Sequence, residues 1–340
     1  MKIGFLLPAN FAVGNPANGV RAQAAFQADA LERAGHEVVR MTPWEQYDLP
    51  GFDVIQFFQG GFAHHNIGTV KKQFANLLVF APIIDSNESN RRYHLAAKLG
   101  GWADKIYTVP GVFREQALAS DLVVCRSEHE RERIAKGLNI PVEKTQIVLN
   151  GVNVPEQGGH NGARVNLDLP DEFLLHVSAY TQERKNVLRL VEAVGPTGKP
   201  LIIVGSAAQG TILEKLHQMI RRFPNVRLLG LLERNLLNSL YASCKVFCLP
   251  SIHEGTGLAA LEAGSYGANV VITRHGGTPD YFRDFAEYVD PYDVGSIRRA
   301  VERAWEKPRT NVLRNHIFSN LTWDHSARSL IQAYKCFSKQ

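Results

Sequence analysis

Two glutamates, Glu254 and Glu262, stand eight residues apart in the run HEGTGLAALEA, and their type and spacing could serve one binding site. The first follows an apolar strand and lies in a glycine-broken turn, and the second lies inside the helix that comes next. A second strand then ends in Gly276-Gly277. Carboxylates accept hydrogen bonds from sugar hydroxyls, while a helix start with bare backbone N–H groups suits phosphates. The block therefore predicts a crevice for a nucleotide whose phosphates are held without a metal.

Each residue of this block has an expected role. Glu262 is expected to accept hydrogen bonds from a ribose diol, and Glu254 to hold a sugar hydroxyl at the mouth of the helix. The diphosphate is expected at the backbone around Gly255, Gly257 and Leu258. Each glutamate alone is explained equally well as a structural residue, Glu262 in an ordinary helix turn and Glu254 as a capping acceptor. The Pro-Ser pair before the block and the glycine pair after it favour binding.

Length and composition describe an ordinary globular protein of two domains. The chain has 340 residues, of which 45% are hydrophobic and 21% charged, so two domains of roughly 150 residues each are expected. Its four cysteines are too few for a disulfide framework, and Cys244 and Cys248 are expected to be buried thiols in a reducing, cytoplasmic setting. The opening MKIGFLLPAN indicates a first strand and not a secretion signal. No stretch reaches the ~20 apolar residues of a membrane span.

The charge of the chain is mildly basic. The formal net charge is +5 and the pI is about 9.0, but the basic pairs are dispersed and lack interleaved aromatic residues, which argues against nucleic acid as a partner. A solvated surface is the favoured interpretation. The alternative is a peripheral patch that contacts anionic lipid headgroups.

Strand-like and helix-like segments alternate along both halves, which predicts an α/β protein with parallel sheets. The predicted strands are KIGFLLP, HEVVRM, DVIQFF, LLVFAPII, LVVCRS and QIVLNGV in the first half, and FLLHVSA, PLIIVGS, VRLLG, VFCLP and NVVITR in the second. Helices are predicted over 20–34, 128–138, 186–194, 212–223, 236–242 and 323–337. The glycine-rich run PEQGGHNGARVN has no apolar period and indicates an interdomain linker.

The glutamate block resembles the signature of retaining glycosyltransferases of sequence family 4, P-S-x-x-E-G-F-G-x-x-x-x-E-A-x-x-x-G-x-P-V-V followed by G-G-x-x-E. The matching residues are Pro250, Ser251, Glu254, Gly255, Gly257, Glu262, Ala263, Gly267, Val270, Val271, Gly276 and Gly277. The chain departs from the pattern at Thr256, where the family has an aromatic residue, at Asn269, where it has proline, and at Asp280, where it has glutamate.

The resemblance extends over nearly the whole chain and implies further site residues. Lys185 matches the lysine of a basic pair that binds the donor diphosphate, and Arg184 is the candidate for its arginine, because Ala179 stands where that arginine usually lies. Gly19 falls in the loop that approaches the donor phosphates or the acceptor. The loops that hold phosphate and base contain Gly205, Gly230 and Leu231.

One family residue has no clear match. The family often carries a histidine just after the fourth strand, close to the donor sugar, and here Asp85, Asn87 and Glu88 occupy that stretch. His94 comes several residues later, and His64 and His65 follow the preceding strand. The identity of the donor sugar is left open by this departure.

The resemblance implies the GT-B architecture, two Rossmann-like domains that face each other across a cleft. The expected parts are an acceptor-binding domain over 1–155, a linker over 156–165, a nucleotide-sugar-binding domain over 166–317, and a C-terminal helix over 318–340 that packs back toward the N-terminal domain. Ligands of such sheets bind at the carboxyl ends of the strands.

The implied function is transfer of a sugar, with retention, from a UDP- or GDP-sugar to a glycan or lipid-linked acceptor in the synthesis of a bacterial surface polysaccharide. Lys185, Arg184 and Glu254 are the expected catalytic residues. No cofactor or catalytic metal is expected, since no D-x-D triplet occurs in the chain. The expected location is the cytoplasm, with peripheral contact at the inner membrane face.

Three alternatives are weighed against this function. A nucleotide-sugar epimerase or a sugar phosphorylase shares the two-domain shape, but the paired glutamates with the glycine pair are more typical of transferases. A catalytically inactive subunit of the same fold gains some support from the missing arginine and histidine. A nicotinamide dehydrogenase is disfavoured, because no G-x-G-x-x-G follows either opening strand.

Overall fold

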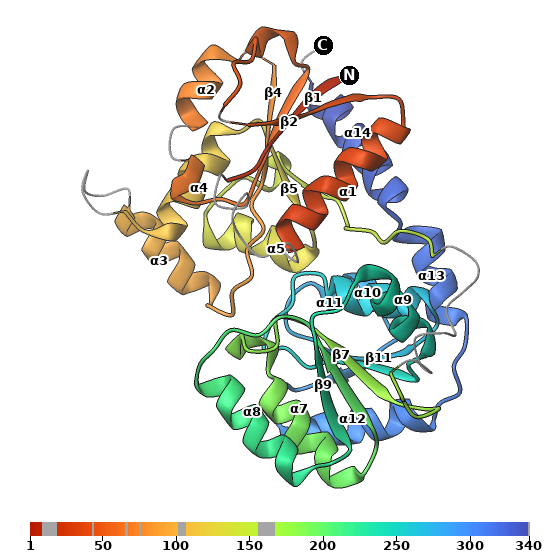
Figure 1. Cartoon of the computed structure of the whole chain (residues 1–340). Coiled ribbons are helices and arrows are strands. Elements are labelled where there is room, and N and C mark those ends of the chain that lie inside the picture. The colour runs from red at the N-terminus through yellow and green to blue at the C-terminus, as the bar shows by residue number, and fades with distance from the viewer. Residues whose placement is uncertain are drawn as a thin grey trace. The chain divides into compact units, whose positions relative to one another are not determined.

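The chain folds into two compact units, which Figure 1 shows in a computed structural model. Residues 1–8, 19–42, 44–64, 67–74, 76–100, 107–155 and 167–338 are described by this structure. The first unit comprises Met1–Gly151 and Trp323–Gln340, and the second comprises Val152–Thr322. The predicted linker over 156–165 lies outside the described residues.

The first unit is built on a six-stranded parallel sheet with the order β2-β1-β3-β4-β5-β6. Its strands are β1 (Lys2–Leu6), β2 (Glu37–Met41), β3 (Val54–Phe58), β4 (Leu77–Ala81), β5 (Leu122–Cys125) and β6 (Thr145–Ile147). All residues of β3, β4 and β5 are buried, as expected for strands covered by helices on both faces.

Among the described residues of the first unit, five helices come from the N-terminal half of the chain and one from its end. They are α1 (Gly19–Arg33), α2 (Ile67–Gln73), α3 (Asn90–Gly100), α4 (Val109–Ala119), α5 (Glu128–Glu132), which continues into a π-helical turn at Arg133–Gly137, and α14 (Trp323–Phe337). Helix α14 packs on α1 through stacked rings of Phe26 and Trp323, 5.4 Å apart. Tyr334 of α14 also donates to the buried Gln56 of β3 at 2.6 Å. The C-terminal helix is therefore part of the first unit.

The second unit repeats this design with the strand order β12-β11-β10-β7-β8-β9, again all parallel. Its strands are β7 (Leu174–Val177), β8 (Leu201–Val204), β9 (Val226–Gly230), β10 (Val246–Leu249), β11 (Asn269–Thr273) and β12 (Glu287–Val289). Its helices are α7 (Val187–Val194), α8 (Thr211–Arg222), α9 (Arg234–Ser243), α10 (Leu258–Ser265), α11 (Thr278–Phe282), α12 (Val294–Glu306) and α13 (Val312–Asn320).

The predicted α/β fold of two Rossmann-like domains is confirmed. Every predicted strand has its counterpart, and the predicted helix over 323–337 matches α14 residue for residue. Helices α2, α3, α4, α11, α12 and α13 and strand β12 were not predicted. Cys244 and Cys248 are free, fully buried thiols, as expected, although Cys244 ends α9 and only Cys248 lies in a strand. Among the described residues, none of the helices combines the length and apolarity that crossing a bilayer requires.

Candidate functional site

The order of strands in the second unit marks one point on its sheet where a ligand site is expected. From β7 the chain moves outward through β8 to β9, and then returns to the other side of β7 with β10, β11 and β12. The order reverses between β7 and β10. In open parallel sheets such a reversal leaves a crevice outside the carboxyl ends of the two strands, and ligands bind there. Lys185 follows β7, and Glu254 follows β10.

A buried ion pair joins these two residues. Lys185 Nζ lies 2.5 Å from Glu254 Oε1, and the side chains are only 13% and 8% exposed. Arg184 Nη1 lies 3.6 Å from the same oxygen, and its side chain is 41% exposed. The basic pair and the first glutamate, predicted from separate motifs, therefore form one cluster at the reversal point.

Backbone contacts explain why Lys185 reaches this position. Arg184 and Lys185 lie in a 3-10 turn after β7, and Asn186 ends it in the left-handed region with φ of 58°. The Asn186 amide donates to the carbonyls of Pro250 (2.9 Å) and Pro291 (2.7 Å). The N–H of Ile252 donates to the Arg184 carbonyl at 2.8 Å. The β7 turn and the β10 loop are thus fixed to each other, so the ion pair is preorganised.

Gly276 and Gly277 hold the backbone of Glu254. The Glu254 N–H donates to the His275 carbonyl at 3.0 Å, and the Gly277 N–H donates to the Glu254 carbonyl at 2.9 Å. Gly276 has φ of 107°, and a Cβ there would lie 2.1 Å from the Glu254 carbonyl oxygen. Gly276 is therefore required by this close approach of two loops. This explains its spacing from Glu254 without assigning it a ligand contact.

Gly205 and Gly230 lie together at the carboxyl ends of β8 and β9. The Gly205 N–H donates to the Gly230 carbonyl at 2.8 Å. Gly205 has φ of 134°, and a Cβ there would lie 1.8 Å from the Ser178 carbonyl oxygen. At Gly230, by contrast, a Cβ would meet nothing within 4 Å, and the following Leu231 is 62% exposed. The loop after β8 is fixed against β7, whereas the loop after β9 is open.

Substitution of Gly205 tests this packing, and Gly210 of the same loop offers a matched control. Gly210 has φ of 141°, close to that of Gly205, but a Cβ there meets nothing within 4 Å. Both Gly→Ala variants carry similar backbone strain, so Gly205→Ala should destabilise the protein by about 1–3 kcal/mol more than Gly210→Ala because only it adds a collision. Denaturant unfolding of both variants measures the difference. Equal losses would contradict the close approach.

Glu262 takes a different partner from Glu254. Its Oε1 lies 2.7 Å from Nη2 of Arg234, the first residue of α9, and its side chain is 20% exposed. The two glutamates are thus both at the carboxyl side of the sheet, but each is held by its own cation. Arg234 was not predicted as a site residue. It lies in a polar run, RNLLNS, that carries no recognisable motif.

The start of α10 follows Glu254 directly. Gly257 precedes the helix with φ of 77°, and as a glycine it has no side chain with which to cap the helix. A Cβ on Gly257 would lie 2.8 Å from Ile272 Cδ1, so glycine is needed there. Thr256 is buried, and its hydroxyl donates to the Tyr281 hydroxyl at 3.3 Å. The aromatic side chain expected at 256 by resemblance is absent, and an aromatic residue from α11 lies beside the threonine instead.

His176 of β7 was not predicted and lies within the same part of the sheet. It is fully buried, with Nδ1 2.7 Å from the Cys248 carbonyl and Nε2 2.7 Å from the Ser178 hydroxyl. A carbonyl only accepts, so Nδ1 carries the proton and Nε2 accepts from the serine. Burial lowers the pKa of His176 to about 4, against the bond to the Cys248 carbonyl, which raises it. The imidazole is therefore neutral near pH 7.

This depressed pKa makes stability depend on pH. Because the unfolded histidine has a pKa of about 6.5 and the folded one about 4, acid favours the unfolded state. The contribution is complete above about 6.5 and is lost as pH falls to about 4, a total of about 3 kcal/mol. Unfolding free energies of the wild type and His176→Asn across this range should converge by that amount at low pH. A constant difference would contradict a neutral, buried His176.

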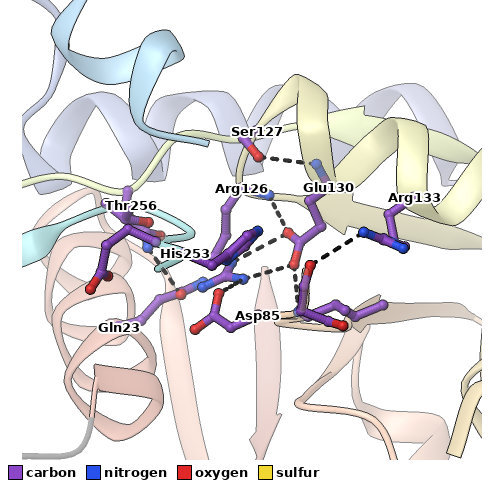
Figure 2. A network of polar contacts seen from close by, with 12 residues as sticks. Gln23, Asp85, Arg126, Ser127, Glu130, Arg133, His253 and Thr256 are labelled. Carbon is purple, nitrogen blue, oxygen red and sulfur yellow. Dashed lines mark hydrogen bonds and ion pairs between the residues drawn. The ribbon is translucent and has the colours of Figure 1, made fainter. Parts of the chain in front are cut away.

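The first unit has its own polar cluster at the carboxyl ends of β4 and β5 (Figure 2). Three consecutive residues after β4 are each bonded by one residue of the segment that follows β5. Glu130 accepts from the Ile84 N–H at 2.7 Å, Arg126 donates to Asp85 at 3.0 Å, and Arg133 donates to the Ser86 carbonyl at 3.2 Å. We call these contacts the loop clamp.

The centre of the loop clamp is a buried ion pair. The Glu130 side chain is 3% and the Arg126 side chain 8% exposed, with 2.9 Å between their charged groups. Glu130 also accepts from the Arg126 N–H at 2.7 Å, and Ser127 caps α5 by accepting from the Glu130 N–H at 3.1 Å. Just before the clamped residues, Ile83 has φ of 55°, a strained conformation for a β-branched residue. The clamp thus holds a strained loop in one shape.

The remaining candidate residues of the first unit have contacts that are typical of structural roles. Gly19 is the first residue of α1, and a Cβ there would meet nothing within 4 Å. His64 is buried, contacts the Phe58 carbonyl at 3.2 Å, and has its pKa lowered by burial. Glu88 pairs with Arg92 at 3.0 Å on the surface. His65 lies outside the described residues.

Comparison with known proteins finds a family match within the second unit. Residues 162–319 match the family described as "Glycosyl transferases group 1". This match covers most of the second unit and agrees with the resemblance found in the sequence. The Lys185–Glu254 ion pair and Glu262 all fall within this segment.

Similar curated proteins carry related names. An uncharacterized glycosyltransferase of Methanocaldococcus jannaschii is 25% identical over 63% of this chain and 59% of its own length. The serotype-specific mannosyltransferase WbdA of Escherichia coli is 28% identical over 49% of this chain and 22% of its own length. The chain thus spans less than two thirds of either relative.

Solved structures agree on the fold. Sucrose-phosphate synthase from Thermosynechococcus elongatus has a TM-score of 0.76 at 19% identity, over 99% of this chain and 98% of that one. Anabaena HepE, solved with UDP and glucose, has a TM-score of 0.73 at 16% identity, over 99% of this chain and 100% of that one. These likenesses identify the two Rossmann-like domains as those of the GT-B fold.

Proposed function

We propose that this chain is a retaining glycosyltransferase that moves a sugar from a UDP- or GDP-sugar to an acceptor hydroxyl without a metal ion. The observation that carries the proposal is the Lys185–Glu254 ion pair at the strand reversal of a group 1 glycosyltransferase domain. We place the nucleotide sugar in the second unit and the acceptor in the first. Membership of sequence family 4 is part of the proposal.

The proposed role of these residues is to stabilise the diphosphate as it leaves. Breaking the bond between the anomeric carbon and the phosphate oxygen builds negative charge on the diphosphate, and preorganised donors in a dry site stabilise that charge. A lysine ammonium has three donors, so Lys185 can keep Glu254 and also bind a phosphate oxygen. Arg184 and the start of α10 at Gly257 and Leu258 supply further positive potential.

In this proposal Glu254 binds the transferred sugar and Glu262 binds the ribose. Glu254 is held by Lys185 beside the place of the diphosphate, so it can orient a hydroxyl of the transferred sugar. Glu262, fixed by Arg234, accepts from the ribose diol. Retention then follows a front-face route, in which the leaving phosphate oxygen takes the acceptor's proton and no carboxylate nucleophile is needed.

The acceptor is proposed to be a glycan or a lipid-linked sugar. The support is the function that two relatives carry in their names: WbdA is a serotype-specific mannosyltransferase, and another E. coli relative, 24% identical over 68% of this chain, is O-antigen chain mannosyltransferase B. A role in bacterial surface polysaccharide synthesis, on the cytoplasmic side of the membrane, fits these relatives.

A product assay tests the proposal. Purified protein is incubated with UDP- and GDP-sugars and a mannose-bearing oligosaccharide in the presence of EDTA, and released nucleotide and the anomeric configuration of the product are measured. We expect transfer with the donor's configuration and no loss of rate in EDTA. An inverted product, or a rate restored only by added Mg²⁺ or Mn²⁺, would contradict the proposed mechanism.

An inactive subunit of the same fold is the second candidate. The observation that favours it is Ala179 in place of the usual arginine, with the substitute Arg184 41% exposed and 3.6 Å from Glu254. In that case nucleotide would bind, but neither transfer nor donor hydrolysis would be seen with any donor.

A further inference from the structure

An unusual concentration of exposed apolar side chains lies on the first unit, around α3. Phe62, Leu95, Leu99, Tyr107 and Val109 are 55%, 61%, 53%, 56% and 49% exposed. We call these five side chains the α3 patch. Soluble proteins rarely leave large apolar side chains together in water, so such a patch marks a contact surface.

Contacts place the side chains of the patch beside α3. The rings of Phe62 and Tyr107 meet edge to face with centroids 6.3 Å apart. The Thr108 hydroxyl, between Tyr107 and Val109, donates to the Ala96 carbonyl of α3 at 2.6 Å. Leu95 and Leu99 are four residues apart and therefore share one face of α3. In Figure 1, α3 stands at the outer edge of its unit.

The opposite face of α3 is anchored to the body of the unit. Tyr93 packs under the Arg133 guanidinium, 4.5 Å from its ring centroid, and Ala97 is 3% exposed. The Tyr93 Cβ also lies close to Gly137, where an added Cβ would be 3.2 Å away. The leucines thus point outward because the other face is already packed. Leu95 and Leu99 are therefore exposed on a helix that is held in place by its opposite face.

The charged side chains of α3 itself are all basic. The sequence of α3, NRRYHLAAKLG, contains Arg91, Arg92 and Lys98 and no acidic residue. All three basic residues are exposed, and Arg91 and Lys98 fall on the helix face of Leu95 and Leu99. A helix face that combines leucines with basic residues, next to a tyrosine and a phenylalanine, is typical of helices that lie in the interface of an anionic bilayer.

We propose that the α3 patch docks the protein on anionic phospholipid, with Leu95 and Leu99 inserted below the headgroups and Arg91 and Lys98 on the phosphates. This goes beyond sugar transfer and does not depend on it, because binding needs neither donor nor acceptor. Each basic residue near an anionic surface adds favourable energy, and each buried leucine adds more.

Vesicle co-sedimentation of the full chain tests the proposal. The probes are vesicles of phosphatidylglycerol and phosphatidylcholine in equal parts, with pure phosphatidylcholine for comparison. We expect binding to the anionic vesicles only, and weaker binding at high salt, which screens the basic residues. The double variant Leu95→Ser/Leu99→Ser and the double variant Arg91→Glu/Lys98→Glu should each bind at least about tenfold more weakly.

The matched control removes two exposed apolar side chains elsewhere. Val142 and Val312 are 47% and 56% exposed, and Val142→Ser/Val312→Ser should bind as the wild type does. Melting temperatures establish that all variants are folded. Equal binding by the leucine variant and the wild type would overturn the proposal. A wild-type dimer in light scattering that the leucine variant dissociates, with no vesicle binding, would assign the patch to a second copy of the chain instead.

Discussion

Glu254→Gln and Lys185→Ala are each expected to lower the rate of sugar transfer by about a hundredfold to a thousandfold, the usual cost of removing one preorganised charge from a transition-state site. The glutamine keeps the size of Glu254 but loses the charge that orients Lys185 at 2.5 Å. The alanine removes the cation nearest to the proposed diphosphate. Because both residues act through one contact, the double variant should lose little more than either single variant.

An exposed ion pair in the same unit is the control for this prediction. Glu172 lies 2.8 Å from Lys245, and its side chain is 55% exposed. Glu172→Gln should therefore leave the transfer rate unchanged. Losses that simply add in the Glu254–Lys185 double variant would show that the pair does not act as a unit, and near-normal rates in both single variants would place the chemistry elsewhere.

Glu130→Gln is expected to lower the free energy of unfolding of the first unit by about 3–5 kcal/mol, because it leaves the Arg126 guanidinium buried without its main countercharge. The Ile84 N–H would also lose a charged acceptor, which holds the loop after the strained Ile83. Calorimetry resolves this loss as a lower melting temperature of one transition, since two units need not unfold together.

The neighbouring Glu128 provides the matched control. It pairs with Arg131 at 2.7 Å on the surface, where its side chain is 55% exposed. Glu128→Gln should change stability by no more than about 1 kcal/mol. Equal effects of the two substitutions would mean that the loop clamp contributes no more than a surface contact.

The fold could be predicted from the sequence where strands were short, apolar and separated by glycine. The predicted helix over 323–337 is correct because its apolar residues repeat with the helical period and bury one face on α1. Helix α3 was not predicted, because two of its leucines face solvent. Its apolar residues therefore do not repeat along one buried face, which is the pattern that predicts a helix. Helix α12 was also missed, although Ile297, Ala300, Val301 and Ala304 follow the helical period and are all buried.

Many residues of the candidate site could be predicted from the sequence, but the contacts between them could not. Lys185 and Glu254 are 69 positions apart. Only the folded structure shows that the Lys185 ammonium donates to one carboxylate oxygen of Glu254. Arg234 and His176 carry no motif, because an arginine in a polar run and a histidine in an apolar strand fit many structural roles. The helix over 128–138, which contains Glu130, was predicted from the sequence. The bond of Glu130 to the Ile84 N–H, 46 positions away, was not.

Calorimetric titration of UDP and GDP into the full chain in EDTA tests most directly the claim that the second unit binds a nucleotide through Lys185 and the start of α10 without a divalent ion. We expect one nucleotide to bind saturably in EDTA, with affinity at least about tenfold lower in Lys185→Ala. Binding that appears only after Mg²⁺ or Mn²⁺ is added, or that is identical in the wild type and Lys185→Ala, would contradict that claim.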